Sequence, residues 1–86
     1  MKPPRVHWDA VAGWVVDTDL DLMPHELQAC VNFTRKVQTD RILAMPRGDR
    51  REQAERALSE LSVGTLRQNV RPASPWERDR IVFSAR

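Results

Sequence analysis

The sequence predicts an α+β fold in which two main helices pack on a small antiparallel sheet, and three observations lead to this prediction. Apolar and polar residues alternate near the start of the chain, as in half-buried strands. Two longer stretches, residues 24–45 and 49–61, repeat apolar residues at helical spacing. Residues 80–84 are β-branched and aromatic, which indicates a further strand. Because the chain has only 86 residues, we expect one domain, residues 1–86.

Residues 14–22 alternate between mainly apolar side chains and aspartates, the pattern of a strand with an acidic outer face. Residues 5–9 would pair with it in a hairpin through residues 10–13, and residues 80–84 would pair with it as well. The competing interpretation makes residues 9–20 helical, and the protein would then be an all-α small helical bundle. We favour the strand because glycine, valine, threonine and aspartate are poor helix formers.

The two predicted helices differ in the width of their apolar faces. The first begins at Pro24, which suits the first helical position, and Pro46 ends it. Its apolar residues cover about half of the helix surface, so we expect it to pack against more than one neighbour. The second, residues 49–61, has a narrow apolar stripe and a fully charged opposite face. The apolar residues of the first helix are Leu27, Cys30, Val31, Phe33, Val37, Ile42, Ala44 and Met45.

Composition restricts the class of protein. Hydrophobic residues at 41% and charged residues at 30% are ordinary for a folded chain. A single cysteine excludes an internal disulfide and no signal-type apolar stretch follows Met1, so we expect the cytoplasm. No apolar run is long enough for a membrane span. The formal net charge is +2, but residues 1–46 hold five basic and six acidic groups, whereas residues 47–86 hold nine and six.

The aspartate triplet begins like a calcium loop but does not continue as one. Asp17, Asp19 and Asp21 have the right spacing for the first ligands. Leu22 and Gln28 stand where the loop needs glycine and glutamate. We therefore predict no metal site here, and the sequence suggests no cofactor.

No set of residues matches a catalytic pattern, so we predict that the protein is not an enzyme. His25 and Glu26 open the zinc-protease helix motif, but Ala29 stands where its second histidine belongs. Cys30 lies on the apolar helix face and is expected to be an inert core thiol.

The segment 47–71 has the order of a helix-turn-helix, which makes a DNA-binding regulator the alternative function. Its second helix, residues 65–70, would have only about two turns before Pro72, with Val63, Leu66 and Val70 facing inward. The glutamates that lie between the arginines of this segment would repel the phosphates of DNA. The residues that would contact DNA are Arg50, Arg51, Thr65, Arg67, Gln68, Asn69 and Arg71.

By elimination, the sequence predicts a small non-enzymatic regulator or inhibitor that binds another macromolecule, with a protein as the favoured partner. Small domains of this kind are often found in phages and mobile elements. The three tryptophans, Trp8, Trp14 and Trp76, are expected mainly in the core. Because so short a chain needs its apolar stripes for that core, exposed charges should make the contact. The expected partner-binding residues are Asp17, Asp19, Asp21, Arg47, Arg50, Arg51 and Arg56.

Overall fold

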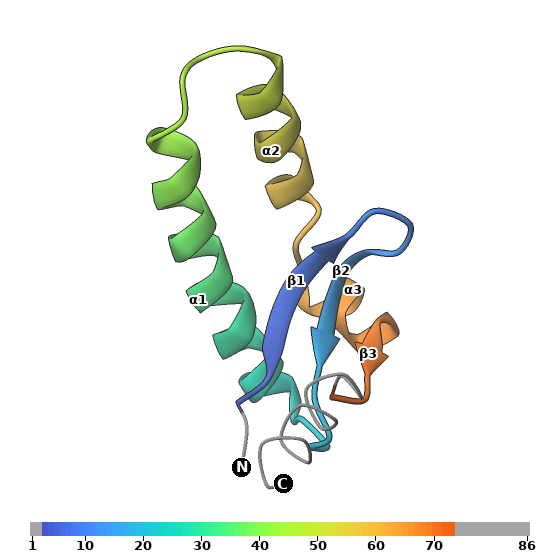
Figure 1. Ribbon diagram of the computed structural model, residues 1–86. Coiled ribbons are helices and arrows are strands. Elements are labelled where there is room, and N and C mark those ends of the chain that lie inside the picture. Colours follow the sequence, from blue (N-terminus) through green and yellow to red (C-terminus); the bar gives the residue numbers. More distant parts are fainter. Residues whose placement is uncertain (1–2, 74–86) are drawn as a thin grey trace, which may run out of the picture.

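The computed structural model describes residues 3–73, and its first two elements form the predicted hairpin (Figure 1). Strand β1 (Arg5–Asp9) pairs antiparallel with β2 (Gly13–Asp17). Three helices and a third strand follow, so the α+β prediction is confirmed. The helical alternative for residues 9–20 is wrong, because this stretch contains the hairpin turn and β2.

The hairpin turn is built by an aspartate and a glycine. The Asp9 carboxylate accepts the backbone N–H groups of Val11 and Ala12, at 2.8 and 2.9 Å. Gly13 closes the turn with a φ of +82°, in the left-handed region that glycine adopts without strain. These interactions are local, which is why the sequence pattern was enough to predict the turn.

Strand β2 ends at Asp17, five residues before the predicted end at Leu22. The Thr18 hydroxyl accepts the backbone N–H of Leu20 at 3.0 Å, and this local bond bends the chain. The predicted row of three aspartates along one strand face is therefore wrong: Asp17 is in the strand and the other two follow it.

The third strand, β3 (Val70–Arg71), pairs parallel with β2, so the sheet is mixed and has the order β1-β2-β3. The prediction of a purely antiparallel sheet is thus wrong. The Asn69 carboxamide holds this strand in place by donating to the carbonyls of Ala12 and Trp14, at 3.3 and 2.9 Å. Val70, predicted to face inward from a helix, is an exposed strand residue instead. The strand predicted at residues 80–84 lies outside the described residues.

Helices α1 (Pro24–Leu43) and α2 (Asp49–Ser59) form an antiparallel pair, and the short α3 (Val63–Gln68) follows (Figure 1). Pro24 takes the predicted first position of α1. The Glu26 carboxylate accepts the backbone N–H of Met23 at 2.9 Å and so satisfies a donor that precedes the helix. Ser62 caps α3 by accepting the backbone N–H of Thr65 at 3.1 Å.

Only one side of α1 is buried. Leu27, Val31, Thr34 and Ile42 face the rest of the protein. Phe33, predicted on the apolar face, is 71% exposed. It lies two residues after Val31, about 200° around the helix, and so points to the opposite side. The prediction that α1 packs against more than one neighbour is confirmed, since it contacts both α2 and α3, but the placement of Phe33 on the packed face is wrong.

Trp14 is the centre of the core. Its side chain is 4% exposed, and its indole Nε1 donates to the carbonyl of Ala57 in α2 at 2.6 Å. Trp8 packs edge-on against it, with ring centroids 5.5 Å apart, and is itself 45% exposed. The buried cluster consists of Trp14, Val16, Leu27, Val31, Leu61 and Leu66.

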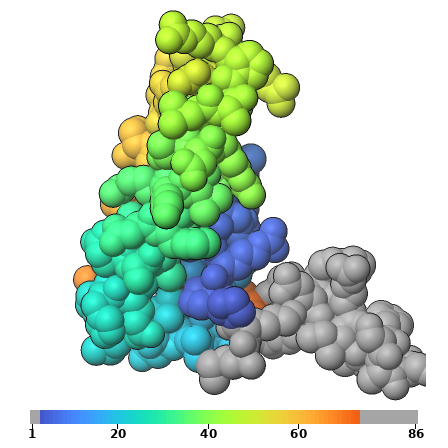
Figure 2. All heavy atoms as spheres, turned by 90° about the vertical axis from the view of Figure 1, so that its left-hand side faces the viewer, coloured from blue at the N-terminus to red at the C-terminus, as the bar shows by residue number. Residues whose placement is uncertain are grey.

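The helical pair projects beyond the sheet. In Figures 1 and 2 the end of α1, the connecting loop and the start of α2 form one end of the molecule, away from β1 and β2. Leu43, at the end of α1, is 63% exposed. Ile42, its neighbour, is only 6% exposed, so this end is buried on one side and open on the other.

We predict that Trp14→Phe lowers the free energy of unfolding by about 2 kcal/mol, because it removes part of the buried ring and also the hydrogen bond to the Ala57 carbonyl. Trp8→Phe is the matched control and should cost less than about 1 kcal/mol, since Trp8 is half exposed. Urea denaturation monitored by circular dichroism measures both. Equal losses would show that Trp14 has no special role.

Candidate functional site

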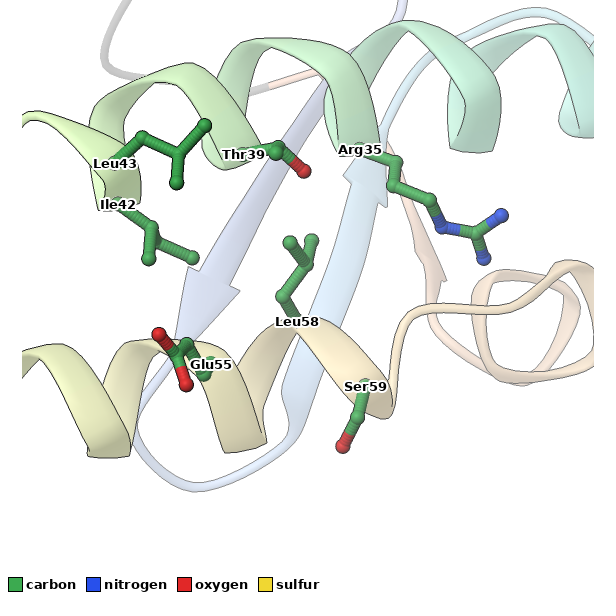
Figure 3. Close-up of a pocket in the computed structure, with 7 residues that line it drawn as sticks. All are labelled: Arg35, Thr39, Ile42, Leu43, Glu55, Leu58 and Ser59. Carbon is green, nitrogen blue, oxygen red and sulfur yellow. The ribbon is translucent and has the colours of Figure 1, made fainter.

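A groove of about 340 Å³ lies between α1 and α2. In Figure 3 it faces the viewer, with the strands of the sheet behind the two helices. Ile42 and Leu43 lie at the end near the connecting loop, Leu58 points toward α1 from the other side, and Arg35 lies at the far end. The lining residues are Arg35, Thr39, Ile42, Leu43, Glu55, Leu58 and Ser59.

Helix α2 forms one wall of the groove although none of its side chains is buried. It is attached near its end by the bond from Trp14 to Ala57 and near its start by Arg51, whose Nη1 is 3.5 Å from the Met45 carbonyl. Leu58 packs partly against the core. The wall is therefore fixed at two points, and Leu58 is the apolar residue that it contributes to the groove.

The groove carries one basic and one acidic side chain. Arg35 donates through Nη2 to the carbonyl of Leu61 at 3.2 Å, which holds its guanidinium beside the connection from α2 to α3. Glu55 is paired with Arg51 at 3.2 Å, one helical turn earlier. The charge of Glu55 is thus compensated, whereas Arg35 is held by a neutral group.

The predicted arginine cluster is spread over the projecting end and the outer side of α2. Arg47, Arg50 and Arg56 are exposed, and Arg51 is half-buried in its contacts with Glu55 and Met45. The ion pair in α2 is thus Arg51 with Glu55; among the described residues, Arg56 has no carboxylate within 4 Å.

The three predicted aspartates have different surroundings. Asp17 accepts from His7 Nε2 at 2.8 Å, and its side chain is only 14% exposed. Asp19 accepts the backbone N–H of Ala73 at 3.1 Å, and Asp21 is exposed. The structure therefore uses two of these carboxylates to hold other parts of the chain.

The sheet face opposite the tryptophans is polar and internally paired. Arg71 in β3 reaches Asp9 in β1 at 3.1 Å, and this pair crosses β2, which lies between the two strands. His7 and Asp17 lie on the same face by register, and Val15 between them is fully buried. Bonds from Ala12, Val11 and Arg71, in that order, lower the pKa of Asp9 from its ordinary value of 3.8 to about 2.

The residues proposed for DNA contact are not brought together. Asn69 and Arg71 use their side chains within the fold, and the Thr65 hydroxyl bonds to Ser62 and to the Glu60 carbonyl. Arg50 is in the first turn of α2, and Figure 1 shows that this end of the helix is the one away from α3. The second helix has six residues, of which Arg67 and Gln68 are exposed.

Sequence reasoning missed the groove. Its apolar residues belong to two helices, and only contact between the helices creates the site. One signal was present: Leu43 lies off the buried arc of α1, yet is apolar and close to the end of the helix.

The chain matches no family model, no curated protein and no solved structure. Within residues 3–73, no helix is both long and apolar enough to cross a membrane, and no three histidine, cysteine, aspartate or glutamate side chains are grouped to hold a metal ion.

We predict that Asp9 makes the free energy of unfolding decrease at low pH. Its pKa is lower in the folded protein, so its contribution is complete above pH 4 and is lost as the pH falls through about 2. In Asp9→Asn the free energy of unfolding should change less between pH 4 and 2. Arg71→Gln should keep more of the pH dependence of stability than Asp9→Asn does, because the backbone N–H groups of Ala12 and Val11 lower the pKa of Asp9 more than Arg71 does. If Arg71→Gln kept less of it than Asp9→Asn, this explanation of the low pKa would be wrong.

Cys30 is half-buried, and burial and the nearby Glu26 carboxylate raise the pKa of its thiol. We predict that native protein reacts with iodoacetamide at pH 8 more slowly than protein unfolded in urea, since the thiolate is the reactive form. Glu26→Gln should accelerate the native reaction, because it removes the negative charge. An unchanged or slower rate in this variant would argue against the electrostatic cause.

Proposed function

We propose that this protein is a non-enzymatic regulator that binds another protein, and that the groove between α1 and α2 receives a helical segment of the partner. The observation that carries the proposal is that α2, a helix of 11 residues, has no fully buried side chain, and its apolar residues Ala54, Ala57 and Leu58 are only half-buried. Helices of this length are marginal alone and are normally stabilised by burying an apolar face. A partner helix over Ile42, Leu43 and Leu58 would provide this burial.

The exposed apolar surface supports the same conclusion. Leu43 is 63% exposed and lines the groove together with Ile42 and Leu58, so three apolar side chains are grouped there. Interfaces of this kind have an apolar centre and a polar rim, and here arginines form part of that rim. The same surface would also suit an inhibitor that acts by covering part of its target.

We propose the cytoplasm as the compartment of this protein, because a small secreted domain usually has disulfides and this chain has a single cysteine.

DNA binding has less support, because two of the side chains needed for it, those of Asn69 and Arg71, bond within the fold. DNA binding would also be distinguished by its salt dependence: affinity for DNA should fall steeply as salt is added, the more steeply the more phosphates the protein contacts.

The proposal predicts that Leu43→Glu abolishes capture of the partner from cells that produce the protein. A carboxylate at the centre of an apolar contact is strongly unfavourable, so the loss should be at least about tenfold. Quantitative mass spectrometry of the captured proteins measures it, and circular dichroism confirms that the variant is folded.

Phe33→Glu is the matched control, since Phe33 is a similarly exposed apolar residue on the same helix that does not line the groove and lies ten residues, about 15 Å, along the helix from Leu43. Capture should survive this change. If instead Phe33→Glu loses the partner and Leu43→Glu keeps it, the outer face of α1 is the interface and the groove is not.

A further inference from the structure

Arg35 has guanidinium donors that no carboxylate in the described part of the chain occupies. Its Nη2 atom donates to the Leu61 carbonyl at 3.2 Å, and no carboxylate within residues 3–73 lies within 4 Å of it. A guanidinium has five N–H groups, so this bond leaves other donors available. Because the side chain is already held, little further ordering is needed when it binds a carboxylate.

The surroundings of the groove are basic. Residues 35–59, which form the helical pair from Arg35 onward, hold seven basic and four acidic residues, a formal net charge of +3. Glu55, the one acidic residue that lines the groove, is compensated by Arg51. An approaching segment therefore meets apolar side chains bordered by positive charge.

We infer that the segment bound in the groove is an amphipathic helix with acidic residues beside its apolar stripe, one of which pairs with Arg35. This inference rests on the proposed docking function and specifies its partner. Arg35 and Leu43 are eight residues apart on α1, about 12 Å, so a partner helix lying along α1 presents its carboxylate about two turns from its apolar anchor. Bidentate pairing of arginine with a carboxylate adds specificity to such a contact.

Charge also decides against two other occupants. A second copy would bring the same basic surface against itself, which is unfavourable. Residues 74–86 of this chain carry three basic and two acidic residues, so they offer no excess of negative charge. An external acidic helix fits the groove better than either.

Two synthetic helical peptides of about 16 residues, with the same leucine positions, test the inference. One carries glutamates beside the leucines and the other carries lysines, and fluorescence anisotropy measures their binding to the full chain. We expect the acidic peptide to bind at least about tenfold more tightly, with an advantage that shrinks as salt is added. Arg35→Gln should remove most of the preference and Arg35→Lys should restore part of it, whereas Arg67→Gln, on α3, should have no effect.

The outcomes separate this inference from the docking function. If both peptides bind equally and Leu43→Glu abolishes both, the groove receives helices but does not select acidic ones. If neither peptide binds, or if Leu43→Glu changes nothing, docking in the groove is itself wrong. If sedimentation shows a dimer that Leu43→Glu dissociates, the occupant is a second copy and the inference is overturned.

Discussion

The bond from the Trp14 indole to the Ala57 carbonyl joins the sheet to the second helix, and much of the structure depends on it. The ring itself occupies the centre of the core and supports Trp8. The same residue is in the central strand, where it pairs with β1 and accepts the Asn69 carboxamide through its carbonyl. One side chain and its backbone thus connect the hairpin, α2 and the chain that leads into β3.

This arrangement leaves the far end of the helical pair with few constraints. The core contacts α2 mainly at its end, through Ala57, Leu58 and the following Leu61. Toward the loop, Arg51 donates to the Met45 carbonyl and so links α2 to the residues that follow α1. Segments with few buried apolar contacts have the lowest local stability, and such segments are commonly the ones that adapt to a partner. The groove lies between the firmly held end and this looser one.

The two faces of the sheet differ in character. One face carries the tryptophans and packs on the helices, while on the other the buried Val15 has polar neighbours, among them the Asp9–Arg71 pair that spans β2. Asp9 therefore has two roles, because it also folds the hairpin turn. The polar side chains of this sheet face bond to one another and to the backbone, so they are less available to contact a partner. Within residues 3–73, the exposed Arg47, Arg50 and Arg56 form no ion pair of this kind.

Local signals in the sequence were sufficient for the elements whose causes are local. The Asp9 turn with Gly13, the proline at the start of α1 and the α+β class could all be predicted, because neighbouring residues determine them. The extent of β2 was missed although its cause, the Thr18 bond to the Leu20 N–H, is also local, because the apolar alternation continues past it. The parallel β3 and the exposure of Phe33 could not be predicted, since Asn69 brings a distant segment to the sheet edge and α1 meets neighbours on one side only. The groove likewise arises from apolar residues of two helices, and only the tertiary structure brings Leu43 and Leu58 together.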